Sequence, residues 1–328
     1  MAKNKGVEVP ETYQIRLSMS VSPHIKSRDD VPRIMRDVVI ALVPAALGAI
    51  FYFRAGAALV MAVCIMSCLV TEYLCSKFLF GQRVVIDDWS AVICGLLLAF
   101  TLPPGLPLWI AAIGGACAIF FGKAVFGGLG QNIFNPALVG RAILLASWPV
   151  AMTTWKAPAS AVDAVTSATP LGLVKESAAH AAATLPRYTD LLLGNVSGSL
   201  GETSALLLLL GAGYLFYRKI ITWHIPVPFI ATVFILSIFT RNPLYEILSG
   251  GLMLGAFFMA TDMVTSPVTP RGRIIFGAMC GGLTWLIRNY GGYPEGVCYA
   301  ILIMNSVAPL IDRYTIPREF GAKKEAAA

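Results

Sequence analysis

A stretch of small and polar residues, Asp163 to Thr169, ends in a hydroxyl that another enzyme could modify. It reads D-A-V-T-S-A-T, and Thr169 stands between Ala168 and Pro170. The small neighbour leaves the threonine hydroxyl accessible, and the proline biases Thr169 towards an extended backbone. No Ser/His/Asp arrangement accompanies it, so we expect modification by an external enzyme rather than self-catalysed chemistry. Composition alone describes the same stretch as a flexible loop.

A second chemical feature lies where this polar segment enters the next apolar block, at Glu202, Thr203 and Ser204. We expect these residues at the N-terminus of a helix, where free backbone N–H groups and the helix dipole favour an anion such as phosphate. Glu202 would oppose the anion unless it caps the backbone. Taken alone, the pattern favours a plain capped helix start over an anion site.

Two asparagines lie in a glycine-rich segment, Phe126 to Gly140, that interrupts the apolar blocks. The backbone groups of such a segment must be buried in protein or line a cavity. Asn132 and Asn135 offer amide donors and acceptors that suit an uncharged polar ring system. Asn135 also fits the N-cap of a helix that starts with Pro136. The residues alone favour the structural and the ligand interpretation equally.

Several ionisable residues fall near or within apolar blocks, where charge is costly and often functional. They are candidates for ion coupling, although most lie at expected helix ends, where an interfacial role is favoured. They are Glu72, Lys123, Arg141, Glu246, Asp262 and Glu295.

All seven cysteines fall in or at the ends of apolar blocks, and none lies in the long polar segment. Cys64 and Cys68 are spaced to share one helix face. No C-x-x-C or Cys/His cluster exists, so we expect no metal centre built by this chain alone. Small buried apolar residues are the favoured interpretation, and a metal site shared with another subunit stays open.

The composition indicates a polytopic membrane protein. Of 328 residues, 57% are hydrophobic and 13% are charged, whereas a soluble domain carries about 25% charged residues. The mean hydropathy is +0.72, and the apolar blocks are about 15–20 residues long, enough to cross a bilayer as helices. The net charge of +7 fits basic cytoplasmic loops, so we expect contact with membrane lipid and not with nucleic acid.

The fold expected from this pattern is an all-α polytopic membrane protein with about ten transmembrane helices. The apolar blocks predict spans at 37–53, 55–74, 88–102, 107–122, 135–150, 203–217, 223–240, 244–260, 273–287 and 294–312. Five regions follow: a cytoplasmic N-terminal segment at 1–36, a first repeat at 37–150, an extracytoplasmic loop at 151–202, a second repeat at 203–312 and a cytoplasmic tail at 313–328.

Basic residues orient the spans. With the N-terminus in the cytoplasm, 19 of the 25 Lys and Arg residues fall on the cytoplasmic side, Arg141 among them. The asymmetry favours both termini inside and the loop at 151–202 outside. We also expect a surface helix in this loop, from about Leu173 to Ala183.

The two halves of the membrane region resemble each other. Ser90 to Leu144 and Ile247 to Leu302 each hold an apolar block, a Pro-bearing turn, a second apolar block and a glycine pair. Gly127-Gly128 corresponds to Gly291-Gly292. Five spans in each half make the second half cross the membrane in the opposite sense. The pattern predicts two inverted five-helix repeats, whose functional site usually lies at their interface.

The motif at 163–169 also resembles the signal that bacterial flavin transferases read, D-x-x-[ST]-[GS]-A-[ST]. Together with F-G-G-L-G-Q-N-I-F-N-P-A-L and T-D-M-V-T-S-P-V-T-P-R-G, it makes nearly the whole chain similar to the D subunits of Rnf complexes. These complexes are ion-translocating ferredoxin:NAD oxidoreductases. The related B subunits of the sodium-pumping NADH:quinone reductase share the core with a longer N-terminal segment.

The resemblance implies a covalent FMN, esterified through its phosphate to Thr169, with Asp163, Thr166, Ser167 and Ala168 as recognition residues. It also implies a non-covalent riboflavin nearer the cytoplasm, whose contacts would map to Asn132 and Asn135. Glu202, Thr203 and Ser204 are candidates for the FMN environment. No residue of the chain is expected to be catalytic by itself.

The resemblance further implies an electron relay between ferredoxin and NAD, coupled to Na⁺ or H⁺, in a bacterial or archaeal cytoplasmic membrane. The expected partners are the A, B, C, E and G subunits and a flavin transferase. The alternative function is a small-solute transporter or channel, since inverted repeats with broken helices are typical of that class. That alternative leaves D-A-V-T-S-A-T without a role.

Overall fold

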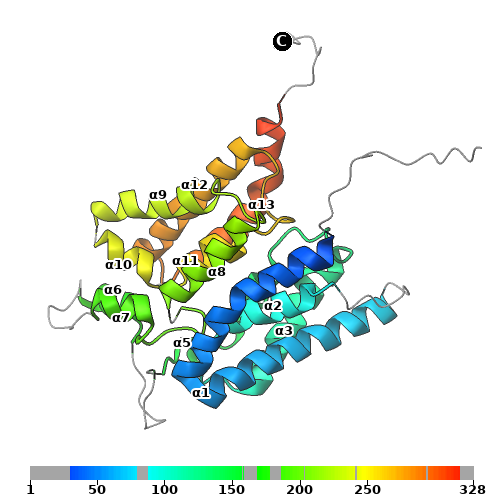
Figure 1. Ribbon diagram of the computed structural model, residues 1–328, viewed down its shortest axis with the longest axis horizontal. Helices are drawn as coiled ribbons and strands as arrows, with labels where there is room; N and C mark the ends of the chain where they lie inside the picture. Colours follow the sequence, from blue (N-terminus) through cyan, green and yellow to red (C-terminus); the bar gives the residue numbers. More distant parts are fainter. Residues whose placement is uncertain are drawn as a thin grey trace, which may run out of the picture. The chain divides into compact units, whose positions relative to one another are not determined.

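A computed structural model describes residues 30–79, 88–156, 158, 168–177, 186–202, 204–240, 242–292 and 295–317. These residues form helices and turns, and the part described holds no β-strand. The helices belong to the unit Val31–Ala328, and Figure 1 shows their order along the chain.

The first two predicted spans form one long kinked element, α1 (Val31–Phe78). Arg54 interrupts it with a left-handed backbone, φ 54° and ψ −137°. A charged residue between two apolar stretches thus marks the joint, as the span limits at 53 and 55 predict. The second half of α1 packs on α2 (Ser90–Phe100) and α3 (Leu108–Gly122).

Cys64 and Cys68 lie on one face of α1, as their spacing predicts. Both thiols are buried, and they face the carbonyl oxygens of Ala111 and Gly115 on α3 at 3.8 and 3.5 Å. All seven cysteines are free. The two side chains therefore serve as small packing residues between helices.

The 3₁₀ turn η1 (Ala124–Phe126) follows α3, and α4 (Pro136–Ser147) packs back on α3. A short α5 (Pro149–Thr153) continues from α4. Gly140 allows the close approach of the two helices, because a Cβ there would lie 2.8 Å from the carbonyl oxygen of Gly114.

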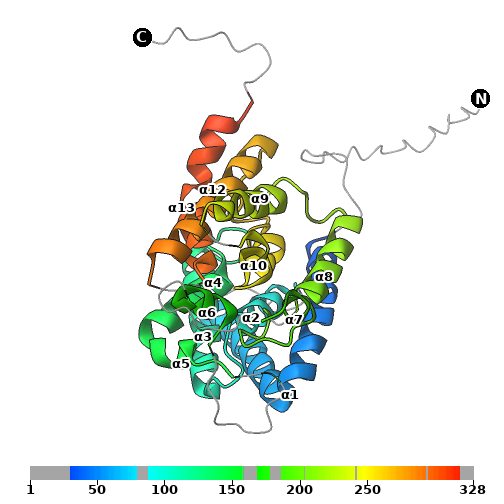
Figure 2. The ribbon, with the colours of Figure 1, turned by 90° about the vertical axis from the view of Figure 1, so that its left-hand side faces the viewer.

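In the second half, α8 (Ala205–Tyr217) packs against α1, and α13 (Val297–Thr315) packs against α4. Helix α12 (Pro270–Tyr290) packs against both α9 (Pro226–Ile238) and α13 (Figure 2). Contacts between α1 and α8 and between α4 and α13 therefore join the two predicted repeats.

The predicted span at 244–260 is not one helix, and this corrects the sequence interpretation. It divides into α10 (Pro243–Leu248), α11 (Leu252–Leu254) and the π-helix Gly255–Met259. Gly250 and Gly251 separate the first two pieces with φ values of 71° and 67°. Left-handed glycines end a helix, so the glycine pair sets the break.

The helix expected from Leu173 to Ala183 begins three residues earlier than predicted. It is α6 (Pro170–Ser177), and residues 178–185 lie outside the described residues. Proline suits the first position of a helix because its missing N–H is not needed there. A further short helix, α7 (Tyr188–Leu193), precedes α8.

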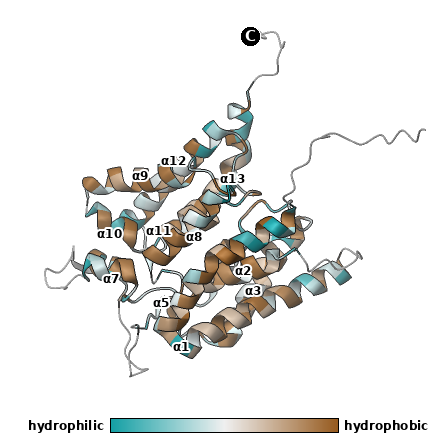
Figure 3. Cartoon of the chain, in the orientation of Figure 1, coloured by the Kyte–Doolittle hydropathy of each residue, from teal (hydrophilic) through white to brown (hydrophobic). Residues whose placement is uncertain are grey.

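Hydrophobic residues make up most of the length of the helices (Figure 3), and many large ones are exposed. On α1, for example, Leu47, Phe51 and Met66 are exposed. Two helical segments, Val31–Phe78 and Leu108–Phe126, are long and apolar enough to cross a membrane, and four shorter apolar helices accompany them. The all-α fold and these helices agree with a membrane protein, while the count of ten spans and their inverted repeat stay predictions.

Candidate functional site

Thr169 is the N-cap of α6. Its Oγ1 accepts a hydrogen bond from the N–H of Gly172 at 3.1 Å, and its carbonyl oxygen accepts from Leu173 at 2.9 Å. The residue is only 7% exposed. The expectation of an openly accessible hydroxyl is therefore wrong for this conformation, because capping turns Thr169 towards the protein. Of the other motif residues, Ala168 is described, while Asp163, Thr166 and Ser167 lie outside the described residues.

The Thr169 side chain lines a cavity of about 210 Å³, which we call the Thr169 cavity. Helices α4, α5, α6 and the start of α13 contribute its walls. Its polar residues include Arg141 and Glu295, and its aromatic residues are Trp155 and Tyr299. The cavity thus combines a threonine hydroxyl, a charged pair and apolar surface, which is the usual mixture of a cofactor site.

Arg141 on α4 and Glu295, two residues before α13, form an ion pair between the two halves of the chain. Arg141 Nη1 also donates to the carbonyl oxygen of Thr101 at 2.5 Å. Arg141 Nε and Glu295 Oε1 are buried and have no hydrogen-bond partner among the described residues. Buried polar atoms are rarely left unpaired without a reason such as a ligand or water.

The sequence count placed Arg141 on the cytoplasmic side and the Thr169 loop on the outer side. Arg141 lines the same cavity as Thr169, which belongs to the loop predicted outside. The shared cavity brings together two residues that the topology prediction assigned to opposite sides. Arg141 lies inside the predicted span 135–150, so the sequence gives no indication of which end of that helix its side chain is nearer.

Glu202 lies close to the same ion pair. It lines a second cavity of about 20 Å³ with Arg141, Glu295 and Gly251. One water molecule fits a cavity of this size. The structure therefore brings Glu202 and Thr169 to two cavities that share Arg141 and Glu295.

The start of α8 is a capped helix rather than an open anion site. Ser204 Oγ accepts from the N–H of Leu207 at 3.4 Å and donates to the carbonyl oxygen of Leu192 at 2.9 Å. Thr203 lies outside the described residues. Ser204 is therefore the N-cap of α8, in agreement with the interpretation of a plain capped helix start.

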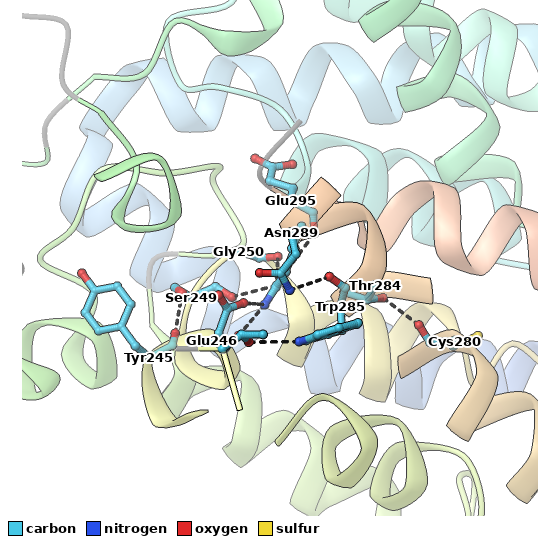
Figure 4. Close-up of polar contacts among 11 residues, drawn as sticks. Tyr245, Glu246, Ser249, Gly250, Cys280, Thr284, Trp285, Asn289 and Glu295 are labelled. Carbon is cyan, nitrogen blue, oxygen red and sulfur yellow. Dashed lines mark hydrogen bonds and ion pairs between the residues drawn. The ribbon is translucent and has the colours of Figure 1, made fainter. Parts of the chain in front are cut away.

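Arg288 supports the ion pair from the second repeat, and the sequence interpretation did not single it out. Its Nη1 donates to Glu246 Oε2 at 2.8 Å, and its Nη2 donates to the carbonyl oxygens of Ser249 and Gly250 at 3.2 and 3.1 Å. Its Nε donates to the carbonyl oxygen of Glu295 at 3.1 Å. Figure 4 shows the Glu295 carboxylate directed away from this cluster.

Arg288 therefore binds the carbonyl groups freed by the break after α10 and fixes the backbone of Glu295. In the sequence, Arg288 is an arginine at the end of an apolar block. That position indicates a buried structural charge and an interfacial charge equally well.

Asn132 and Asn135 line a different cavity of about 120 Å³, the Asn132 cavity, with Ser90, Lys123 and Asp262 among its polar residues. Asn135 is the predicted N-cap: its Oδ1 accepts from Ala137 and Leu138 at 3.1 and 3.4 Å. Its Nδ2 donates to the carbonyl oxygen of Met259 at 3.2 Å. The Asn135 amide is thus engaged on both sides.

Asn132 is less committed than Asn135. Its Nδ2 donates to the carbonyl oxygen of Phe134 at 3.3 Å, and the residue lies at the cavity wall. Lys123 pairs with Glu72 and donates to Ser90 Oγ at 2.6 Å. The Lys123 ammonium in this cavity is therefore held by its own neighbours.

Asp262 lies in the turn after the π-helix and lines the Asn132 cavity. Burial raises the pKa of its carboxyl above the ordinary value of 3.8, against the lowering effect of hydrogen bonds from Val264 N–H and Thr265 Oγ1. The neutral form of Asp262 is thereby favoured relative to an exposed aspartate.

Comparisons with known proteins agree on one family. The sequence model of the NQR2, RnfD, RnfE family matches residues 18–321. A Clostridium ljungdahlii protein is named as the D subunit of a proton-translocating ferredoxin:NAD(+) oxidoreductase complex. It is 50% identical over 94% of this chain and 97% of its own length.

Two further relatives have similar names. The D subunit of the Na(+)-translocating ferredoxin:NAD(+) oxidoreductase complex of Acetobacterium woodii is 46% identical, over 96% of this chain and 99% of its own length. The D subunit of the ion-translocating oxidoreductase complex of Halorhodospira halophila is 39% identical, over 91% and 94%.

Proposed function

Because the chain belongs to the NQR2, RnfD, RnfE family, we propose that it is the D subunit of an ion-translocating ferredoxin:NAD⁺ oxidoreductase complex and carries covalent FMN on Thr169. It is then a membrane subunit of an oxidoreductase translocase, without a complete active site of its own. Its partners are the A, B, C, E and G subunits, a flavin transferase and the surrounding lipid.

The observation that carries the FMN proposal is the position of the Thr169 hydroxyl. It closes the motif D-A-V-T-S-A-T and stands at once at the N-terminus of α6 and at the wall of the Thr169 cavity. A helix N-terminus stabilises a phosphate through its N–H groups and dipole. The residues present therefore fit a phosphate ester whose remaining part enters the cavity.

When bound, FMN supplies one- and two-electron transfer, and the protein holds and tunes it. Thr169 anchors the phosphate, and α6 stabilises its charge. Trp155 and Tyr299 offer aromatic surface, and the buried setting limits the access of water. No side chain of this chain needs to act as an acid or a base for FMN to be held in this way.

A non-covalent riboflavin in the Asn132 cavity belongs to the same proposal. The apolar wall and the polar group of Ser90, Lys123, Asn132 and Asp262 suit an uncharged flavin. Since Asn135 is committed to its cap, Asn132 is the better contact of the two.

Membership of the family is compatible with either Na⁺ or H⁺ as the coupling ion. Relatives at 50% and 46% identity are named for protons and for Na⁺ respectively. The charge distribution supports a cytoplasmic-membrane location with both termini inside and the Thr169 loop outside.

The experiment is a denaturing gel viewed under ultraviolet light, after expression in membranes with a flavin transferase. The wild-type chain should give a fluorescent band, and Thr169→Val should remove it while the protein band stays. Thr153→Val is the matched control, because Thr153 lines the same cavity outside the motif. A fluorescent band that survives in the Thr169→Val chain would reject the proposal.

A further inference from the structure

Helix α6, which begins directly after Thr169, is anchored to the second half of the chain at two points. Leu171 is only 2% exposed, and its side chain occupies the space that a Cβ on Gly250 would take, in the break after α10. Near the other end of α6, Lys175 Nζ donates a hydrogen bond to the carbonyl oxygen of Gly291, directly after α12. The position of α6 is therefore set by tertiary contacts on both its first and its second turn.

These contacts also maintain α6 as a helix. It has eight residues, whereas an isolated helix shorter than about 12–15 residues is marginal in water. Val174 buries its side chain only by packing on the small cluster that contains Leu191 and Tyr245. Short elements with few buried contacts open at the lowest cost in a folded protein. We therefore expect α6 to open and close locally while the rest of the chain stays folded.

While α6 is docked, the Thr169 hydroxyl is not available to another protein. The residue is 7% exposed, and its Oγ1 lies against the first turn of α6, where it accepts from the N–H of Gly172 at 3.1 Å. Transfer of a phosphoryl group needs the attacking oxygen in line with the leaving oxygen. It also needs a base of the enzyme within hydrogen-bond reach of the hydroxyl proton. An enzyme cannot bring both groups to a buried residue between packed helices.

We propose that α6 is a lid that controls maturation of the flavin site: Thr169 receives FMN only while α6 is undocked, and docking of α6 then encloses the linkage. This regulation rests on the FMN attachment to Thr169. In the transfer, the Thr169 oxygen bonds to the flavin phosphorus, and the hydroxyl proton passes to a base of the transferase. The donor is a flavin dinucleotide, whose phosphoanhydride bond breaks and releases a nucleoside monophosphate. Nothing is oxidised or reduced in this step.

The lid makes the rate of attachment depend on how firmly α6 is docked. A docked chain without flavin offers its hydroxyl only during the fraction of time that α6 is open. When opening and closing are fast relative to transfer, the rate follows that fraction. A change that weakens docking must therefore speed the attachment, although the motif at 163–169 is unaltered. A transferase that acted on the docked chain would gain nothing from such a change.

The test measures how fast the fluorescent band at the mass of this chain forms on a purified complex. The complex is assembled without a flavin transferase, and the transferase and flavin adenine dinucleotide are then added. Leu171→Ala removes the buried anchor, and truncation of a buried leucine should speed attachment at least about tenfold. Leu173→Ala is the matched control on the same helix, because Leu173 is only half-buried, and its rate should stay close to that of the wild type.

A second variant covers the event that Leu171→Ala does not assemble. Lys175→Gln removes the charged donor to the carbonyl oxygen of Gly291 and leaves the apolar anchor in place, so it should also speed attachment. Hydrogen exchange of the Leu173 amide reports the opening of α6 independently, because this N–H donates to the carbonyl oxygen of Thr169 at 2.9 Å. Exchange of this amide should be faster in each variant that speeds attachment.

Co-expression with the transferase separates the two proposals. Absence of the band from the co-expressed wild-type chain rejects the FMN attachment itself. A band there, with equal or slower attachment to the purified variants or with faster hydrogen exchange but no faster attachment, overturns the lid. Co-expression measures the final yield, which loss of unstable protein also lowers, whereas the rate on the purified complex measures access to the Thr169 hydroxyl.

Discussion

At the scale of single residues, Thr169 combines two roles in one side chain. Its hydroxyl closes the modification motif, and its side chain caps α6. The sequence predicted the motif and an extended backbone before Pro170, yet it predicted an accessible hydroxyl. It could not show the capping, because the helix was expected to start at Leu173. Arg288 escaped notice for a related reason: its partners come together only through the fold.

Thr169→Ser tests whether the hydroxyl, rather than the branched shape of the threonine side chain, is what the cap and the attachment need. Serine keeps the hydroxyl for both roles, so we expect the fluorescent band to remain and thermal stability to change little. Thr169→Val should remove the band and also cost about 1 kcal/mol through loss of the cap. Gel fluorescence and thermal unfolding of the purified complex measure the two effects. Loss of the band in the serine variant would contradict this account.

The two asparagines should respond differently to substitution. Asn132→Leu is expected to lower the non-covalent flavin recovered by acid extraction, because Asn132 is the freer contact of the Asn132 cavity. Asn135→Asp keeps the cap oxygen that accepts from Ala137 and Leu138 but loses the donor to the carbonyl oxygen of Met259, so it should lower the unfolding temperature while most of the extractable flavin remains. Unchanged recovery in Asn132→Leu would reject the assignment of Asn132.

At the scale of elements, the break after α10 is the feature against which α6 and Arg288 pack. A Cβ at Gly250 would meet the side chain of Leu171 on α6 and lie 3.0 Å from Arg288 Nη2. The glycine pair thus lets the break lie against both α6 and Arg288. The sequence predicted a continuous span here, since the apolar content of residues 244–260 outweighed two glycines. Arg288 lies far along the chain from the carbonyl groups that it binds at the break, so no local sequence pattern predicts these hydrogen bonds.

Gly250→Ala tests the importance of this break. The left-handed backbone costs a residue with a Cβ about 1–2 kcal/mol, and contact with Leu171 adds to it. We expect a lower unfolding temperature of the complex and a weaker covalent flavin signal. Gly213→Ala on α8 is the control, because a Cβ there meets nothing within 4 Å and helix propensity favours alanine. Equal stability of the two variants would contradict the role of the break.

The turn after the π-helix should give the protein a measurable pH dependence. The folded-state pKa of Asp262 is raised, so its contribution to stability is full below the ordinary value of 3.8 and is lost as the pH rises through the folded pKa. Asp262→Asn removes the ionisation and should flatten that part of the stability curve. Thermal unfolding as a function of pH measures it, and an unchanged slope in the variant would be the contrary result.

At the scale of the whole molecule, the all-α class and the apolar helices follow directly from composition and block length. Span limits at Arg54 and the cap at Asn135 were also predictable, because a charge between apolar blocks and an Asn-Pro pair are local signals. Of the candidate site, the sequence singled out Thr169 through its motif and Glu202 as a candidate neighbour, but it gave no reason to place Arg141 and Glu295 beside them. Packing between helices that are distant in the sequence brings together Glu202, Arg141 and Glu295. Their spacing in the sequence therefore does not predict that they are neighbours.

The most direct test of the central claim is mass spectrometry of the peptide that contains Thr169. The complex is expressed with its flavin transferase, and the peptide is sequenced by fragmentation. We predict one FMN per chain, linked through phosphate to Thr169, with every other hydroxyl of the peptide unmodified. An unmodified Thr169 in a complex that still holds covalent flavin on this chain, or a flavin on another of its residues, would contradict it.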